Sequence, residues 1–357
     1  MLLFVLFAHL LLVQSGTSAG ISVPFYSLPY ASLLFNLTIG SPGGINGHAL
    51  GSHFRQTLAH LTAGNRSVAL ELVNRAYVDR DLHVKPAYWK VLIANYGAAF
   101  QQVDFERQPE EAVNEINAFV ANATHQKIRD LLLPGDVDAG TALVLVNAVY
   151  FKGDWYETFN LLYTTETKFF VDEENVHQVK MMSETMTIMY GETEDVQVLE
   201  LPYTDKATKF TVFLPKDRFG LSAWLQKVDG AGLLGLMDQM HRRRVEVKLP
   251  RFKIESDFKL KDVLDALGFS DGFKQTANFS GISDERLYIS EGFHKAFIDV
   301  NENGCEAAAA TAFKSYFVSA MRYPEEPVHF RADRPFAFLI SRERIPLFFG
   351  RFMGPSL

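Results

Sequence analysis

One stretch of this sequence decides how the rest is interpreted: Asn301-Glu-Asn-Gly-Cys-Glu-Ala-Ala-Ala-Ala-Thr-Ala-Phe-Lys-Ser-Tyr-Phe-Val-Ser-Ala-Met-Arg-Tyr-Pro324. Its four consecutive alanines favour a helix by propensity alone. However, an apolar strand-like run ends just before it, at Val300, and the prolines Pro324 and Pro327 follow it. We therefore predict a long exposed loop, which compact domains rarely keep unless the loop has a function.

Small side chains recur at every second position of this loop, at Cys305, Ala307, Ala309 and Thr311. On a β-strand all four would face the same way and would fit a narrow space. The loop is therefore predicted to be able to become a central strand of a sheet. About 15 residues at ~3.3 Å each would span roughly 50 Å, which is enough to cross a domain of this size.

The elements around the loop indicate α+β architecture, because helical patterns come early and strands dominate later. Apolar spacing of three and four predicts helices over residues 52–62, 86–100, 111–132, 221–240 and 258–267. Apolar or alternating runs predict strands over residues 143–151, 168–171, 178–182, 197–201, 210–214, 245–249, 287–290, 296–300, 337–340 and 347–349. No linker divides residues 20–357, so we expect a single domain.

Composition excludes several classes of protein. The 357 residues carry 35 Lys+Arg against 42 Asp+Glu, a net charge of −7, so nucleic acid is a poor general partner. Cys305 is the only cysteine, which excludes an internal disulfide and a thiolate zinc site, and the histidines show no metal-binding spacing. We expect neither a metal nor a cofactor, and we expect a monomer.

The amino-terminal residues predict secretion. Residues 2–13 form one apolar run that is too short to span a bilayer, and small Thr17 and Ala19 precede a cleavage point before Gly20. We therefore predict a signal peptide over residues 1–19, an extracellular location and no membrane association. Four N-x-S/T sequons agree with this route, at Asn36, Asn65, Asn122 and Asn278.

Two further patterns need weighing. Gly268-Phe-Ser-Asp-Gly272 matches the G-x-S-x-G pattern of serine hydrolases, but a helical pattern precedes Ser270 and a loop follows it, the reverse of a nucleophile elbow. We expect a helix cap and a turn, and no enzyme. The basic cluster Arg242, Arg243, Arg244 and Lys248 is either a solvated loop or a site for a heparin-like polyanion.

The sequence resembles the serpin family in many short motifs that occur in the family's order. Glu302-Asn-Gly-Cys-Glu-Ala-Ala-Ala-Ala-Thr311 is similar to the family's hinge: Glu302, Gly304, Cys305, Glu306, Ala307, Ala308, Ala309, Ala310 and Thr311. Further matches are Leu145-Val-Asn-Ala-Val-Tyr-Phe-Lys-Gly-Asp-Trp155, Leu199-Glu-Leu-Pro-Tyr203, Val247-Lys-Leu-Pro-Arg-Phe252, Asn278-Phe-Ser-Gly-Ile-Ser283, His294-Lys-Ala-Phe297 and Phe330-Arg-Ala-Asp-Arg-Pro-Phe336.

This resemblance implies a multi-helix, three-sheet single domain that inhibits serine proteases. A protease attacks the exposed loop, residues 302–323, and the cleaved loop inserts into the central sheet, which distorts the trapped acyl-enzyme. Counting along the family pattern places the attacked bond at Val318-Ser319, which implies an elastase- or chymotrypsin-like target. The loop is slightly longer than is usual, so cleavage after Phe317, Met321 or Arg322 stays open, and Arg322 would imply a trypsin-like protease.

The resemblance also assigns residues that control insertion. Asn147 and His294 belong to the family's shutter, where hydrogen bonds beneath the sheet hold the opening strands. Gly153 and Trp155 lie near the breach, where insertion begins. Cys305 replaces the usual Thr or Ser, and its thiol would form a mixed disulfide if it were exposed. The family's first helix and its Ser-Pro shutter segment are not found before residue 50, which predicts a truncated amino-terminal region. The alternative is a non-inhibitory serpin-fold protein, either a carrier, a chaperone or an inactive isoform.

Overall fold

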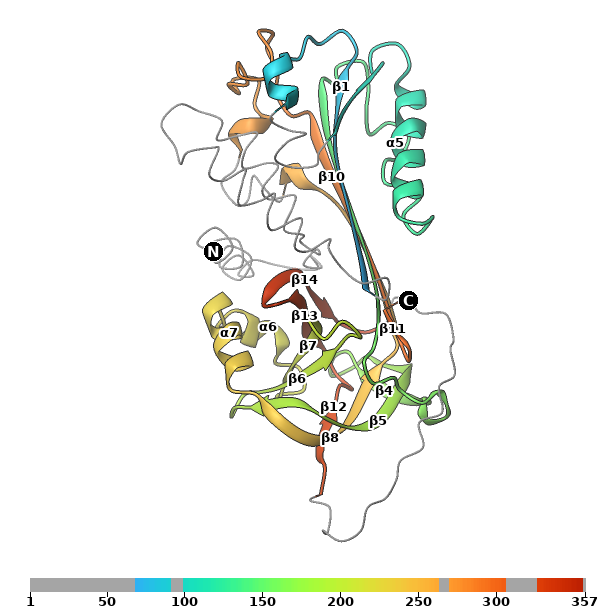
Figure 1. Ribbon diagram of the computed structural model, residues 1–357, viewed down its shortest axis with the longest axis vertical. Helices are drawn as coiled ribbons and strands as arrows, with labels where there is room; N and C mark the ends of the chain where they lie inside the picture. Colours follow the sequence, from blue (N-terminus) through green and yellow to red (C-terminus); the bar gives the residue numbers. More distant parts are fainter. Residues whose placement is uncertain (1–67, 91–98, 263–269, 306–325, 356–357) are drawn as a thin grey trace. The chain divides into compact units, whose positions relative to one another are not determined.

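The computed structural model describes residues 68–90, 99–262, 270–305 and 326–355 (Figure 1). The described strands form two sheets of mixed direction, one with six strands and one with eight. The described residues also fall into two compact units, 152–253 with 299–355, and 68–151 with 254–298. The boundaries between the units fall within three strands, after Phe151, Lys253 and Ile298.

The six-stranded sheet contains the start of the predicted loop, Gly304 and Cys305. Its order is β2 (Ala99–Val103), β1 (Val68–Asp79), β3 (Leu143–Asp154), β11 (Gly304–Cys305), β10 (Glu291–Asn301) and β9 (Phe252–Lys259). The central strand β3 is covered on both faces, and this explains why its sequence is a continuous apolar run.

Helix α5 (Pro109–Ala123) covers one face of this sheet, and Ile116 and Val120 pack with Val144 and Val146 of β3 (Figure 1). The helix begins with Pro109, whose fixed φ suits the first turn of a helix. The side chains of β3 at the alternate positions, such as Leu145, belong to a second core on the other face. Burial on both faces thus holds β3 in the middle of the sheet.

The eight-stranded sheet lies within one unit. Its order is β12 (Val328–Arg331), β8 (His241–Pro250), β5 (Val176–Glu192), β6 (Val196–Pro202), β7 (Thr208–Pro215), β13 (Phe336–Arg342) and β14 (Ile345–Phe352), with β4 (Thr165–Phe170) also paired to β5. Where three sheets were expected, the described strands form two, because the 17-residue strand β5 pairs with β4 and β8 along its length and with β6 at its end.

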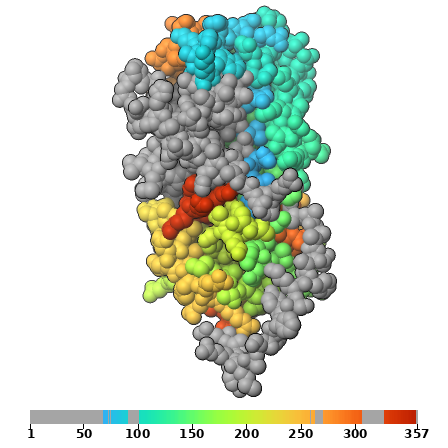
Figure 2. Space-filling view, viewed as in Figure 1, coloured from blue at the N-terminus to red at the C-terminus, as the bar shows by residue number. Residues whose placement is uncertain are grey.

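Two short helices complete this unit. Helices α6 (Leu221–Leu225) and α7 (Gly230–Asp238) pack on β6, β7 and β13 through a shared apolar core that includes Phe213 and Leu339. The C-terminal strands, in red, and the yellow-green strands of this unit form one continuous surface in Figure 2. None of the helices in the described ranges is long and apolar enough to cross a bilayer.

The helix predictions differ from the structure in several places. The expected helix 86–100 is helical at 86–90, and its last two residues belong to strand β2. The expected helix 111–132 ends at Ala123, because His125 and Gln126 take positive φ, although Ile128 and Leu131 still join the same core. The expected helix 221–240 is two helices, and residues 52–62 lie outside the described residues.

Two more expectations concern the segment before β10. Residues 258–259 belong to strand β9 and only 260–262 are helical, while 263–269 lie outside the described residues. The expected strand 287–290 is extended but is not a strand, because Ile289 bonds to Gly272 and Ser290 bonds to Leu143 rather than to a neighbouring strand along a ladder. Its apolar Leu287 and Ile289 are nevertheless buried.

Candidate functional site

The start of the predicted loop is a two-residue strand between β3 and β10. Gly304 and Cys305 pair antiparallel with Asp154 and Gly153 of β3. The same two residues pair antiparallel with Asn301 and Val300 of β10. Beyond this point β3 and β10 pair directly and in parallel, from Val144 with Glu291 to Tyr150 with Phe297. The sheet is therefore already opened by two residues at the end where the loop begins.

Gly304 is required at its position by close backbone approach. Its φ is +146°, in the region that side chains rarely adopt, and a Cβ added there would lie 2.1 Å from the carbonyl oxygen of Gly153. It would also lie 2.7 Å from the Cα of Asp154. Because real Cβ contacts are never this short, only glycine lets β11 approach β3.

Cys305 is fully buried, and its thiol lies 3.0 Å from the hydroxyl of Tyr203. The condition for a mixed disulfide, an exposed thiol, is therefore not met in this structure, because β11 pairs on both sides and its Cys305 side chain is buried. A buried thiol of this kind is a poor nucleophile. Burial, with the neighbouring Cys305 as a smaller cause, also raises the pKa of Tyr203 well above its usual range.

Trp155 connects the same region to the end of β10. Its indole stacks on the ring of Tyr203 at 4.6 Å, and its Nε1 donates to the carbonyl of Asn301 at 2.9 Å. Its backbone N–H donates to the carbonyl of Asn303 at 2.8 Å. The tryptophan therefore holds the turn between β10 and β11.

Glu302 precedes the hinge glycine and is buried. Its carboxylate accepts a hydrogen bond from the hydroxyl of Thr164 at 2.9 Å and lies 3.8 Å from the guanidinium of Arg251. Its carbonyl accepts from the N–H of Phe159 at 2.9 Å. These contacts hold the base of the loop to the segment before β4.

Asn147 and His294 meet in the buried middle of the six-stranded sheet. The two residues are register partners on β3 and β10, and Nδ1 of His294 lies 2.5 Å from Oδ1 of Asn147. The amide of Asn147 donates to the carbonyl of Val73 on β1 at 3.3 Å. A polar pair therefore crosses the seam between β3 and β10, and opening that seam requires breaking it.

The geometry is that of a sheet with a segment entering between two central strands, and comparisons with known proteins agree with it. The Serpin family model, described as serine protease inhibitor, matches residues 30–355. The chain belongs to the serpin family.

Relatives and solved structures support this membership. Iris of Ixodes ricinus is 39% identical over 299 residues, which cover 83% of this serpin and 79% of Iris. Leukocyte elastase inhibitor of Homo sapiens is 38% identical over 316 residues, which cover 85% and 82% of the two chains. The crystal structure of Serpin48 from the insect Tenebrio molitor matches with a TM-score of 0.85 at 29% identity, over 99% of this serpin and 97% of that chain. Serpins inhibit proteases and are not catalysts, so this serpin is not an enzyme.

Much of the loop itself lies outside the described residues. This applies to Glu306, Ala307, Ala308, Ala309, Ala310, Thr311, Phe317, Val318, Ser319, Met321 and Arg322. The segment before residue 50, in which the family's first helix was predicted to be absent, also lies outside the described residues. These assignments stay predictions.

The basic cluster lies on a strand and not in a loop. Because side chains alternate along β8, Arg242, Arg244 and Lys248 share one face and Arg243 lies on the other. Lys248 pairs with Glu246 at 3.0 Å on the shared face. A nearby carboxylate therefore partly neutralises the expected polyanion site, and the three consecutive arginines do not act as one patch.

The two sequons within the described residues differ in their surroundings. Asn278 is exposed in a segment without regular secondary structure, and Ser280 donates to its side chain. Asn122 lies in the last turn of α5, and the hydroxyl of Thr124 is buried and donates to the carbonyl of Val120. Asn36 and Asn65 lie outside the described residues. Asn278 is thus the better acceptor of the two.

The hydrolase-like pattern has no elbow geometry. Ser270 precedes a single 3₁₀ turn (Asp271–Phe273) and not a helix, and Gly268 lies outside the described residues. Among the described residues no group of three or more His, Cys, Asp or Glu side chains could hold a metal ion.

The contacts that hold the hinge from a distance were not predicted from the sequence. Tyr203 and Arg251 each lie in a quoted motif, but neither the contact of Tyr203 with Cys305 nor that of Arg251 with Glu302 was expected, and Thr164 was not singled out. The available signal was the two motifs, Leu199–Tyr203 and Val247–Phe252, since a buried tyrosine needs a partner for its hydroxyl.

Proposed function

We propose that this serpin is a secreted suicide-substrate inhibitor of serine proteases, in which the cleaved loop inserts between β3 and β10. The single observation that carries the proposal is the pairing of Gly304 and Cys305 with both strands. In the proposed mechanism, this two-residue pairing is the point from which the rest of the loop would enter the sheet.

Extending that register supports the proposal residue by residue. The pairs of β11 with β3 and β10 continue so that Ala307 would lie opposite Phe151 and Ile298, and Ala309 opposite Val149 and Ala296. All four of these strand residues are buried. Small side chains are therefore the ones that would fit, because a long or charged side chain would have to enter a closed core.

The same register brings Thr311 opposite both Asn147 and His294. These two residues bond to each other across the closed seam. The hydroxyl of an inserted threonine would offer both a donor and an acceptor to the separated pair. Insertion would therefore not leave two buried polar side chains without partners.

The energy of insertion would come from added backbone pairing. The parallel pairing of residues 144–150 with 291–297 would be replaced by two antiparallel ladders, one on each side of the new strand. Each net hydrogen bond contributes about 0.5–1.5 kcal/mol. The intact loop cannot gain this energy because its far end is joined to β12. Cleavage would free the loop from β12 and allow it to insert.

For the target we propose a protease of elastase- or chymotrypsin-like specificity that attacks Val318-Ser319. The similarity to a relative named leukocyte elastase inhibitor supports this class. Cleavage after Phe317, Met321 or Arg322 would move the specificity, and cleavage after Arg322 would indicate a trypsin-like protease. We also propose that residues 1–19 direct secretion and that Arg242, Arg244 and Lys248, on one face of β8, contact a heparin-like glycosaminoglycan.

The experiment incubates the protein with elastase, chymotrypsin and trypsin in turn. We expect a covalent complex that survives SDS with one of them, a sharp rise in the melting temperature of the cleaved serpin, and a released C-terminal peptide whose mass identifies the attacked bond. If all three proteases cut the loop without a complex and without added heat resistance, the protein is a non-inhibitory serpin, such as a carrier.

A matched pair of variants tests the insertion itself. Ala307→Arg places a charge where the register predicts a closed core, so we expect turnover as a substrate without complex formation. Glu326 is exposed and lies after every considered cleavage site, so it would not enter the sheet with the cleaved loop. The control variant Glu326→Arg should therefore leave complex formation intact. Equal inhibition by both variants would refute the register.

A further inference from the structure

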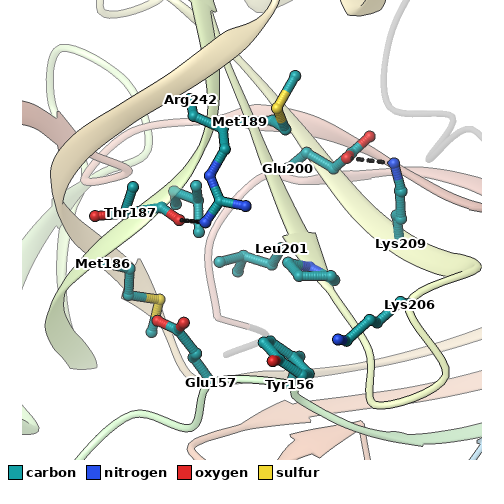
Figure 3. A pocket seen from close by; sticks show the side chains of 12 residues that line it. Tyr156, Glu157, Met186, Thr187, Met189, Glu200, Leu201, Lys206, Lys209 and Arg242 are labelled. Carbon is teal, nitrogen blue, oxygen red and sulfur yellow. Dashed lines mark hydrogen bonds and ion pairs between the residues drawn. The ribbon is translucent and has the colours of Figure 1, made fainter.

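A pocket within one unit of this serpin has features of a small-molecule site. It has a volume of about 340 Å³ and lies between β5, β6 and the first residues of β8, beside the segment that follows Trp155 (Figure 3). This volume is at the lower end of the range for small-molecule sites. None of the described hinge residues, 302–305, lines the pocket.

One part of the pocket is apolar. Met186, Leu201 and the ring of Tyr156 line it, and the first two are buried in the sheet. Tyr156 is about half exposed, and its backbone N–H donates to the carbonyl of Pro202, which fixes the ring beside the strand end. The two buried side chains form the base of this part, and the ring of Tyr156 offers most of the accessible surface for an aliphatic or aromatic body.

Cations border this apolar part. Arg242 enters from β8 and Lys206 from the turn between β6 and β7 (Figure 3). The guanidinium of Arg242 donates to the carbonyl of Thr187 at 3.1 Å, which orients it and uses one of its five N–H groups. The ammonium of Lys206 lies over the ring of Tyr156 at 4.4 Å.

The charges in the pocket do not cancel. Lys209 and Glu200 also line it and pair with each other at 2.8 Å. Glu157 is the remaining acid, so the lining carries three cations and two anions, a net charge of +1. Within the described part of the chain, neither Arg242 nor Lys206 has a carboxylate within 4.0 Å. An oriented guanidinium beside an apolar wall recognises an acid group that carries a hydrophobic body.

We propose that this pocket binds a small amphipathic organic anion, with its carboxylate or sulfonate on Arg242 and Lys206 and its apolar body against Met186, Leu201 and Tyr156. The site differs from a glycosaminoglycan contact because it uses a single arginine of the basic cluster and an apolar wall.

The test measures binding of 8-anilinonaphthalene-1-sulfonate to the full chain by fluorescence and by calorimetry. We expect one site per chain, and we expect N-phenyl-1-naphthylamine, which has the same rings without the sulfonate, to bind at least tenfold more weakly. Because charge-assisted hydrogen bonds are the strong ones, Arg242→Gln should weaken sulfonate binding about tenfold or more. Lys206→Gln should also weaken sulfonate binding, and it replaces Arg242→Gln in the test if that variant does not fold.

Two control variants make the result decisive. Arg243→Gln removes the adjacent positive charge from the opposite face of β8 and should leave the affinity unchanged. Leu162→Ser replaces a large apolar side chain that is 82% exposed, the highest value among the described residues, and that does not line the pocket, so the affinity should again be unchanged. Equal weakening by Arg243→Gln, loss of binding in Leu162→Ser, or equal binding of the neutral amine would each overturn the proposal. None of these measurements depends on protease inhibition.

Discussion

Replacing Gly304 by alanine should release the two-residue strand β11 from the sheet. The added Cβ would lie 2.1 Å from the carbonyl oxygen of Gly153, and the positive φ disfavours any side chain. The atoms that would have to move are backbone atoms of β3, which is paired on both sides. We therefore expect β11 to leave rather than β3 to shift.

The expected change in the free energy of opening the hinge follows from the contacts that β11 makes in the sheet. Its two residues pair with both neighbouring strands, and each net hydrogen bond contributes about 0.5–1.5 kcal/mol. Burial of the small Cys305 side chain adds about 1 kcal/mol. The cost of opening this segment should therefore fall by about 2–4 kcal/mol.

Cys305 provides the assay, because it is the only cysteine in the chain and is fully buried. Its labelling by 5,5′-dithiobis-(2-nitrobenzoate) requires local opening, and each 1.4 kcal/mol changes the open population by about tenfold. We expect the labelling rate of Gly304→Ala to rise at least tenfold, with a fall in the melting temperature of about 3–8 °C.

Gly281→Ala is the matched control. A Cβ added at Gly281 meets no atom within 4 Å, so its labelling rate and melting temperature should equal those of the unmodified protein. If Gly304→Ala labels within twofold of the unmodified protein, the close approach of β11 to β3 does not hold the hinge, and the reasoning is refuted.

Three further predictions concern single residues. Burial raises the pKa of Tyr203, so the neutral phenol stabilises the fold below the unfolded pKa of about 10, and this stabilisation is lost as the pH rises through the folded pKa. The melting temperature should therefore fall less between pH 9 and 11 in Tyr203→Phe than in the unmodified protein. An unchanged profile of melting temperature against pH would contradict this. Asn147→Leu should lower the free energy of unfolding by about 1–3 kcal/mol, measured by denaturant titration, because His294 loses its partner across the seam; no change would exclude that role. Mass spectrometry of protein from a secreting cell should find glycan on Asn278 and none on Asn122, whose sequon hydroxyl is buried, and the reverse pattern would be inconsistent with the structure.

The burial of the central strands could be predicted from the sequence because burial on two faces leaves a continuous apolar run, as in β3. Family membership could be predicted for a similar reason, since many short motifs occur in order. Helix ends could not be predicted as well. The apolar spacing continues past Ala123, but the backbone turns at His125 and the later apolar residues reach the same core from a loop.

The sequence named the residues of the hinge but not the side chains that contact them. The sequence marked Cys305 as a small residue, but whether its thiol is exposed depends on pairing with strands about 150 residues away and on Tyr203. The three arginines on β8 read as one patch in the sequence, and strand alternation separates them.

Residue size and spacing are local properties, so the sequence shows directly that a segment of small residues at every second position follows an apolar, strand-like run. The folded arrangement is needed to see that Gly304 has no room for a Cβ, that Cys305 is buried and that Arg242 borders an apolar pocket. These three facts depend on which distant strands lie beside each residue and in which register, and local periodicity contains no information about that pairing.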